Sequence, residues 1–359
     1  MFKLYQKYIL KKFFKKFFLI SFVFLCLAIV LNIFEEISFF KNSTTQIMLP
    51  YFLTLLNAPI ILFEIFPFIF LIAAQFFFFE LHKNKEMALM KNNGLSNFKI
   101  IKTLFISSFL TGFILIIFYY NFASKLKFFY TDIKNNFSND NKYLAMVNDT
   151  GLWLKDEVKN GVLIVKSKSI QDNLLLNVII NKFDTNFQLE KTIQAEKIDI
   201  STKNWIIYNP IVTEKNISQN NFDKIKIQTN FDSNKIKSLF SNFSTLDLFE
   251  LFNLKNDYEK LGYSSDEIEI HLLKLFSSPY LYALMTILSS IIMINIRKDH
   301  SIFFNALLGI FISVMIYYLN YMFISLGNTG KIPPMVSVIL PMIFLTILSL
   351  IGLVRINEK

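Results

Sequence analysis

The sequence predicts a membrane protein with six transmembrane helices and an all-β domain inserted between the third and the fourth. Hydrophobic residues make up 53% of the chain and the mean hydropathy is +0.43, values typical of a polytopic membrane protein. Six apolar runs are long enough to cross a bilayer. Residues 129–245 instead carry short runs rich in Ile and Val, separated by Asn, Asp and Lys, as in a β-sandwich or a barrel-like domain.

The first apolar run, residues 17–34, follows a lysine-rich N-terminus. A signal peptide has this general form, but here Glu35 and Glu36 follow the run, and the small residues that a signal peptidase needs are missing. We therefore expect an uncleaved first span. Because lysines flanking a span favour the cytoplasmic side, the N-terminus is predicted to lie in the cytoplasm.

The second apolar run, residues 51–79, is longer than the roughly 20 residues that a span requires. Pro59 and Pro67 within it are expected to kink the helix. Glu64 is an intramembrane carboxylate, and such groups usually face protein or water because hydrocarbon does not solvate them. The simpler alternative is that Glu64 lies near the outer interface and is solvated there. Both interpretations stay open.

The polar stretch after the second span is the candidate functional segment. Its lysines place it in the cytoplasm, and its composition predicts one helix over residues 80–94 that ends at Gly94 in a left-handed conformation. One stripe of that helix combines an acidic group with apolar and amide side chains: Glu86, Leu89, Met90 and Asn93. We interpret this stripe as a docking surface for a separate cytoplasmic ATPase. The alternative is that Glu86 is a solvated surface charge.

The third span, residues 100–121, returns the chain to the outside, where the β domain follows. Five runs have a strand-like pattern: residues 161–167, 174–183, 192–200, 205–213 and 222–228. Polar and apolar residues alternate most clearly at residues 224–227, so one face of the sheet is expected in water and the other in an apolar interior.

The chain returns to the membrane through three further spans, residues 277–296, 301–326 and 335–354. The strongest basic clusters fall on one side: the N-terminus, the loop after the second span, the tight turn at Arg297 and the C-terminus. The positive-inside rule makes this side the cytoplasm, so both termini are predicted inside and the β domain outside. The predicted division is an N-terminal membrane half, a β domain, a helical connector and a C-terminal membrane half: residues 1–128, 129–245, 246–276 and 277–359.

The sequence contains no recognisable catalytic or metal-binding motif. A glycine-rich phosphate loop, a nucleophile elbow and a His-Glu-x-x-His helix are all missing. The three histidines lie far apart, and the single cysteine, Cys26, allows no internal disulfide. The net charge of +10 resides mostly in lysines beside the spans, which argues against nucleic-acid binding. We expect a non-enzymatic chain with no cofactor of its own, so any ATP is bound by a partner.

Four lysines near the outer ends of the spans form a second candidate site: Lys41, Lys125, Lys127 and Lys331. Ordinary contact with lipid headgroups is the simpler interpretation. The functional alternative is a basic rim that binds the phosphate groups of an anionic lipid.

Several segments together resemble the LptF/LptG (YjgP/YjgQ) family of lipopolysaccharide export permeases, and more closely its G-type subunit, LptG. The similar segments, in chain order, are residues 58–67, 85–96, 152–156, 271–279 and 330–341. Residues 85–96 are similar to the family's Glu-x-x-Ala-x-x-Ala-x-Gly-x-Ser coupling segment, with Glu86, Gly94 and Ser96 in register. This chain departs from that pattern at Leu89 and Asn92, where the family has Ala.

The resemblance implies an ABC transporter in the bacterial inner membrane. In that family the permease pairs with a second permease, LptF-like in this case, and with a dimer of an LptB-like cytoplasmic ATPase. The complex extracts lipopolysaccharide and passes it to a periplasmic bridge made of LptC/LptA-like proteins. The resemblance further implies that the β domain is a periplasmic jellyroll that stacks on the bridge, and that the first and fifth spans line a lateral gate.

Three alternatives differ in what they predict. A permease of another lipid or lipoprotein export system would have four spans, with its outer domain after the first. A membrane-anchored periplasmic scaffold without a transport role would copurify with no ATPase and would tolerate charge reversal at Glu86. An integral lipid-modifying enzyme would need a catalytic cluster, which the sequence does not show.

Overall fold

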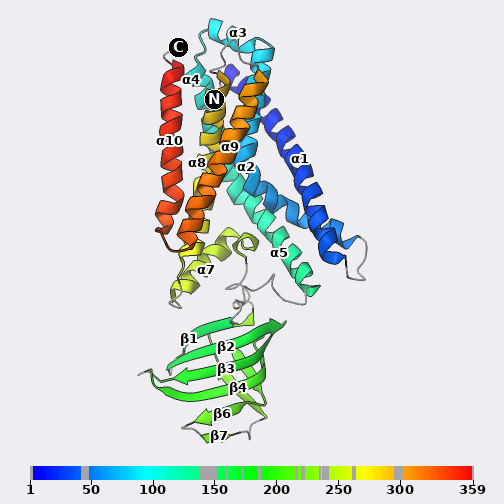
Figure 1. Ribbon diagram of the computed structural model, residues 1–359, viewed down its shortest axis with the longest axis vertical. Coiled ribbons are helices and arrows are strands. Elements are labelled where there is room, and N and C mark those ends of the chain that lie inside the picture. Colours follow the sequence, from blue (N-terminus) through cyan, green and yellow to red (C-terminus); the bar gives the residue numbers. More distant parts are fainter. Residues whose placement is uncertain are drawn as a thin grey trace. The chain divides into compact units, whose positions relative to one another are not determined.

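The computed structural model describes residues 3–41, 48–137, 152–158, 161–171, 173–184, 187–214, 217–219, 223–233, 236, 242–260, 264–294 and 302–357. The chain divides into two compact units. Residues 1–127 with 266–359 hold the long helices, and residues 128–265 hold the β sheet. The predicted insertion of an all-β domain among membrane helices is therefore confirmed (Figure 1). The predicted turn at Arg297 lies outside the described residues.

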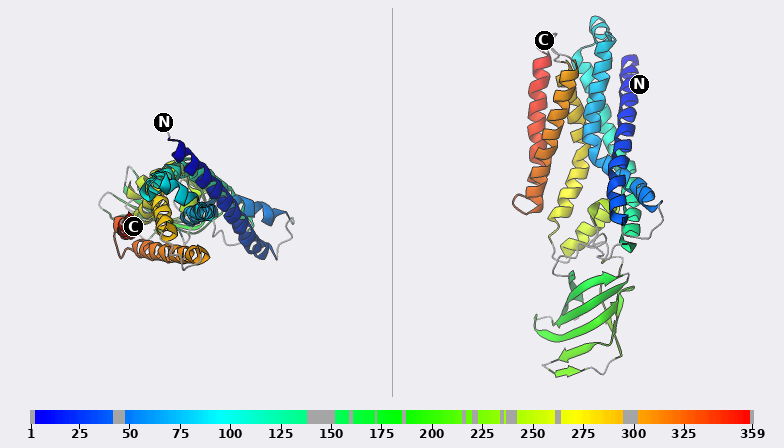
Figure 2. Two further views of the ribbon diagram at one scale, coloured as in Figure 1. Left: turned by 90° about the horizontal axis from the view of Figure 1, so that it is seen from above. Right: turned by 45° about the vertical axis from the view of Figure 1, so that its right-hand side comes forward.

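Within the described residues, six helical segments are long and apolar enough to cross a membrane, as predicted. They are α1 (Leu4–Phe40), α2 (Leu49–Lys83), α4 (Asn97–Ile114) with its continuation, α8 (Asp266–Ile294), α9 (Ile302–Asn328) and α10 (Pro334–Asn357). The continuation of α4 is a π-helical stretch, η1 (Leu115–Tyr120), followed by α5 (Asn121–Asn136). The chain is thus a multi-pass membrane protein. α2 contains Pro59 and Pro67 and changes direction along its length (Figures 1 and 2).

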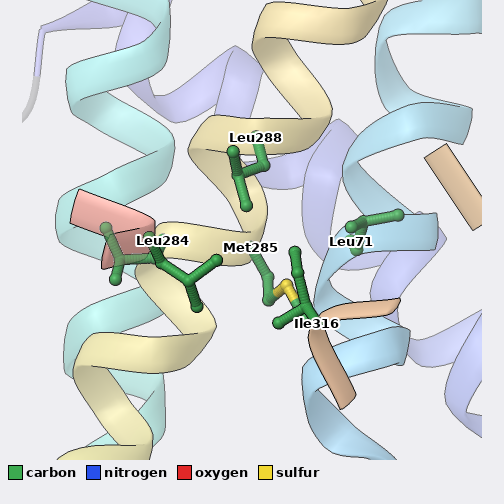
Figure 3. Close-up of a cluster of buried hydrophobic side chains, with 6 residues drawn as sticks. Leu71, Leu284, Met285, Leu288 and Ile316 are labelled. Atoms are coloured by element: carbon green, nitrogen blue, oxygen red, sulfur yellow. The ribbon is translucent and has the colours of Figure 1, made fainter. Parts of the chain in front are cut away.

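The helical unit is built around α2 and α8, the two spans with the largest buried share. A cluster of aliphatic side chains joins them to α9 and α10 (Figure 3): Leu71, Leu284, Met285, Leu288, Ile316 and Leu345. α4 approaches α8 closely at Gly112, where an added Cβ would lie 2.6 Å from Cα of Pro279. A small residue is therefore required there, as is common where membrane helices cross.

α1 contacts the bundle through aromatic rings. The ring centroids of Phe17 and Phe70 lie 4.8 Å apart, and those of Phe13 and Phe77 lie 6.4 Å apart in an edge-to-face arrangement. The opposite face of α1 is apolar and exposed, including Phe18 and Phe22. Lipid tails are as apolar as these side chains, so a membrane helix can present such a face outward.

The β unit contains one antiparallel sheet of eight strands within the described residues. The strands are β1 (Leu152–Val158), β2 (Gly161–Gln171), β3 (Leu174–Phe183), β4 (Leu189–Asp199), β5 (Asn204–Tyr208), β6 (Ile211–Glu214), β7 (Ile217–Gln219) and β8 (Lys224–Gln228). Their order is β1-β2-β3-β4-β5-β8, and β6 pairs with both β4 and β7. The strand predicted at 205–213 is two strands, because Asn209 adopts a left-handed φ of 45° and Pro210 follows it.

One face of the sheet is apolar, as the alternating pattern predicts. Leu154, Val165, Ile180, Ile193 and Val212 lie directly opposite one another on successive strands, and all five are buried. This register builds a continuous apolar ladder across five strands.

The chain after β8 is bound to the sheet by two sets of hydrogen bonds. The buried Asp156 carboxylate on β1 accepts from the backbone N–H of Asn230 at 2.9 Å and from its side-chain amide at 2.8 Å. The indole N–H of Trp205 on β5 donates to the carbonyl of Phe231 at 2.8 Å. These bonds satisfy polar groups that burial would otherwise leave unpaired.

The expected connector over residues 246–276 consists of parts of two helices. A short η2 (Phe243–Thr245) precedes α7 (Leu248–Lys260), and α8 begins at Asp266, well before the predicted span at residue 277. Asp266, Glu267 and Glu269 occupy the first turn of α8, where negative charges are favourable at the positive end of the helix dipole. His271 belongs to the early part of α8.

Candidate functional site

The segment between the second and third spans forms a short helix of its own. α2 ends at Lys83, and α3 (Glu86–Asn92) starts after a sharp turn in which Lys85 adopts a left-handed φ of 58°. This conformation costs a non-glycine residue about 1–2 kcal/mol. The prediction of a single helix over residues 80–94 is therefore wrong. Its predicted end is confirmed, since Gly94 has a φ of 76°.

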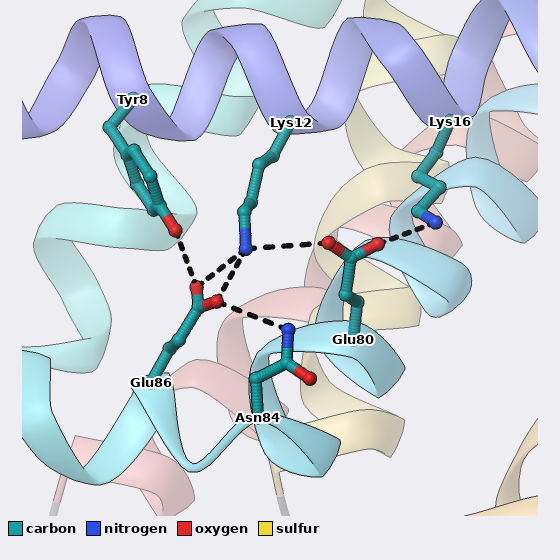
Figure 4. Close-up of polar contacts among 6 residues, drawn as sticks. All are labelled: Tyr8, Lys12, Lys16, Glu80, Asn84 and Glu86. Atoms are coloured by element: carbon teal, nitrogen blue, oxygen red, sulfur yellow. Dashed lines mark hydrogen bonds and ion pairs between the residues drawn. The ribbon is translucent and has the colours of Figure 1, made fainter.

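The turn directs Glu86, the first residue of α3, toward α1 (Figure 4). The Glu86 carboxylate accepts a hydrogen bond from the Tyr8 hydroxyl at 2.8 Å. It also accepts from Nζ of Lys12 at 2.6 and 2.7 Å, and from Nδ2 of Asn84 at 3.2 Å. The side chain of Glu86 is only 20% exposed. The acidic group of the predicted docking stripe is thus bonded within the chain.

Lys12 also links α1 to the end of α2. Its Nζ lies 3.3 Å from a carboxylate oxygen of Glu80, and Lys16, one turn later on α1, lies 2.5 Å from the other oxygen. One polar cluster therefore joins three side chains of α1 to three from the end of α2, the turn after it and the start of α3. Its members are Tyr8, Lys12, Lys16, Glu80, Asn84 and Glu86, and we call it the α1–α3 cluster (Figure 4). Because its charges are partly exposed, each ion pair contributes at most about 1 kcal/mol.

The ionisation of Glu86 reflects these contacts. Partial burial raises the pKa of its carboxyl, but the hydrogen bonds from Lys12, Tyr8 and Asn84 lower it more. The pKa therefore lies below the ordinary value of 4.5, and the group is a carboxylate at neutral pH.

The other residues of the predicted stripe lie differently. Leu89 is 60% exposed, Met90 is half-buried, and Asn93 donates from its side chain to the carbonyl of Leu89 at 2.9 Å. Met87, which the sequence analysis did not single out, is buried. Leu89 is the large apolar side chain that α3 presents outward.

The four rim lysines lie on three separate elements. Lys41 follows the last residue of α1, Lys125 and Lys127 belong to α5, and Lys331 lies in the turn before α10. Lys41, Lys125 and Lys331 are exposed. Lys127 is half-buried and donates to Oδ1 of Asn57 at 2.6 Å.

The contact of Lys127 belongs to a buried polar group that the sequence analysis missed. Nδ2 of Asn57, on α2, donates in turn to Oδ1 of Asn32 on α1 at 3.2 Å, and both asparagines are buried. Asparagines inside apolar runs are the signal that could have revealed it, because an amide in hydrocarbon requires a partner. This group joins α1, α2 and α5.

Glu64 lies on an exposed part of α2. It is close enough to Tyr317 of α9 to interact with it electrostatically. The ring centroids of Tyr317 and Phe68 lie 5.5 Å apart.

Among the described residues, no group of three or more His, Cys, Asp or Glu side chains is arranged to hold a metal ion.

Comparison with known proteins identifies the family. The family model described as lipopolysaccharide export system permease LptF/LptG matches residues 7–355, nearly the whole chain. A comparison with curated proteins found no match. The family match confirms the resemblance to the LptF/LptG family, without distinguishing its two subunit types, and covers both the helical unit and the β unit. Members of this family are membrane permease subunits that are not themselves catalytic. The chain therefore belongs to the LptF/LptG family of lipopolysaccharide export permeases.

Proposed function

We propose that this chain is a permease of the G type in an ABC transporter that extracts lipopolysaccharide from the bacterial inner membrane and passes it to a periplasmic bridge. A second permease of the same fold, an ATPase dimer and a bridge protein are its proposed partners. ATP is bound by the ATPase, and this chain needs no cofactor. Family membership and the six-span layout support this assignment.

The proposed orientation puts α3 and both termini in the cytoplasm. All three lie at the same end of the helical unit (Figures 1 and 2). This end carries the N-terminal lysines and those that flank α3, and basic residues favour the cytoplasmic side. The β unit follows an odd number of spans, so the proposed orientation puts it in the periplasm.

Extraction of lipopolysaccharide needs an external energy source. Each CH₂ group that leaves the membrane for water costs about 0.8 kcal/mol, and a lipid with several acyl chains exposes many such groups. ATP hydrolysis by a partner can meet this cost only if the movement of that partner reaches the spans.

The observation that carries the proposal is the α1–α3 cluster. α3 lies between two spans. Lys12 of α1 binds both Glu86 of α3 and Glu80 near the end of α2, so α1 is joined to both elements. A force on α3 is therefore transmitted to α1 as well as to its covalent neighbours α2 and α4. In this mechanism Leu89 contacts the ATPase, Met87 anchors the helix, and Glu86 sets its orientation.

The rim lysines and Glu64 keep their proposed roles within this mechanism. Lys41, Lys125 and Lys331 are exposed and available to lipid phosphates. Lys127 would have to exchange its bond to Asn57 for one to a phosphate. The exposed Glu64 carboxylate is expected to face a water-containing cavity, since an ionised group facing lipid tails is costly.

The test is copurification of ATPase activity with the chain in mild detergent. We expect Leu89→Asp to abolish it, because a carboxylate in an apolar contact is costly to desolvate. Leu189→Asp in the β unit is the matched control, since Leu189 is 57% exposed and lies on β4. Glu86→Lys reverses a charge in the α1–α3 cluster and is expected to remove the ATPase too.

The two α3 variants together test whether the ATPase docks through α3. Loss of the ATPase in Leu89→Asp, with the control unaffected, supports docking through α3. Retention of the ATPase in both α3 variants would contradict it. If the native chain elutes without any ATPase or second permease, the scaffold alternative is correct.

A further inference from the structure

The lysines of α1 fall into two sets that face different ways. Lys12 and Lys16 point toward the carboxylates of Glu80 and Glu86, which neutralise them (Figure 4). The second set recurs at every fourth position and is exposed: Lys3, Lys7, Lys11 and Lys15. Residues four apart lie one above another on a helix, so these four form one basic stripe. Among the described residues, no carboxylate lies within ion-pair distance of this stripe.

The basic stripe continues into an apolar one on the same face of α1. Phe18 and Phe22 lie seven residues beyond Lys11 and Lys15, and seven residues make about two helical turns. Phe18 is 68% exposed and Phe22 is 66% exposed. From Lys11 to Phe22 the helix advances about 17 Å at 1.5 Å per residue. A phospholipid has the same arrangement, because its phosphate headgroup could contact the lysines at one end of this face while its acyl chains lie along the exposed aromatic rings toward the other.

We propose that this face of α1 is a binding site for an anionic phospholipid of the bilayer. Lys7, Lys11 and Lys15 bind the phosphate and headgroup, and Phe18 and Phe22 lie along the acyl chains. The site is separate from the rim lysines, which lie near the opposite ends of the spans. It goes beyond the proposed function, because the ligand is a membrane constituent rather than the exported lipid.

Charge decides between the candidate occupants of this face. A protein subunit packed on it would have to supply several carboxylates, whereas a bilayer containing anionic lipid supplies phosphates at the depth where a span ends. Free phosphate would not use Phe18 and Phe22. Basic side chains next to an anionic membrane each contribute about fivefold in affinity.

The experiment measures which lipid the purified chain retains. Native mass spectrometry of the detergent-solubilised full chain, titrated with phosphatidylglycerol or phosphatidylcholine, gives the preference for the anionic headgroup. The stripe variant is K7Q/K11Q/K15Q, in which Gln keeps the helix propensity. The control K197Q/K203Q/K226Q removes the same charge from exposed positions of the β unit. A second variant, F18A/F22A, tests the acyl-chain part.

We expect the native chain and the control to prefer phosphatidylglycerol, and the stripe variant to lose about 100-fold of that preference. F18A/F22A should weaken binding of both lipids. Rising salt should reduce the preference, because the lysines are exposed. Equal binding of both lipids by the native chain, or an unchanged preference in the stripe variant, would overturn the proposal. So would full competition by inorganic phosphate, or loss of the preference once a second permease is bound.

Discussion

Replacing Lys12 with methionine removes the cation that Glu80 and Glu86 share. Glu86 keeps its bonds to Tyr8 and Asn84, and Glu80 keeps Lys16, so neither carboxylate is left alone. Partly exposed ion pairs contribute about 0.2–1 kcal/mol each, and Lys12 makes two of them. The two carboxylates would also repel each other without it. We therefore expect the helical unit to lose about 1–2 kcal/mol of stability.

The assay follows unfolding of the purified chain in detergent as SDS is added. Both tryptophans, Trp153 and Trp205, lie in the β unit, so their fluorescence reports that unit. The helical signal in circular dichroism reports mainly the helical unit. Lys12→Met should shift the helical transition and leave the fluorescence transition in place. Lys11→Met is the matched control, because Lys11 is exposed on the neighbouring position of α1.

A double-mutant cycle tests whether the contact itself is responsible. Lys12→Met and Glu86→Gln each remove one side of the contact, and their combination should cost about 0.5–1 kcal/mol less than the sum of the two. If the two changes add within about 0.3 kcal/mol, Lys12 and Glu86 are not coupled and the α1–α3 cluster does not join α1 to α3.

Three further predictions concern other parts of the chain. Because the pKa of Glu86 lies below its ordinary 4.5, the carboxylate stabilises the fold at neutral pH; this stability should fall as the pH drops below about 4.5, and less so in Glu86→Gln. Gly112→Ala should cost about 1–3 kcal/mol in the helical transition, since the new methyl group collides with the backbone of Pro279. Asp156→Ala leaves the backbone N–H of Asn230 without its acceptor and should shift the fluorescence transition by about 1–3 kcal/mol, with the helical transition unchanged.

Features with a local cause could be predicted from the sequence. The spans follow from length and hydropathy, and the apolar ladder of the sheet follows from alternation, as at Val165 and Ile180. The left-handed end at Gly94 follows from the freedom of glycine. The break before α3 has no such signal, because Lys85 is an ordinary helix former that is held at a positive φ by its surroundings.

The partners of Glu86 could not be predicted for a different reason. Lys12 is separated from Glu86 by 74 positions, and the sequence offers Lys11, Lys15 and Lys16 as equal candidates. The choice depends on which face of α1 packs on α2. In a membrane helix that face is not marked by hydrophobicity, because the outward face is equally apolar. Here aromatic packing at Phe13 and Phe17 decides it.

The bonding of Glu86 changes how an acidic residue in a coupling segment should be understood. A carboxylate that is only 20% exposed and is held by Lys12, Tyr8 and Asn84 has little surface left for a partner. A cation on a partner would have to displace Lys12. The gain in binding free energy would then be only the difference between two ion pairs of similar strength. The exposed Leu89 requires no such exchange, because its burial against a partner removes apolar surface from water directly. In this segment affinity for the ATPase is therefore expected to come from Leu89, and the orientation of α3 from Glu86.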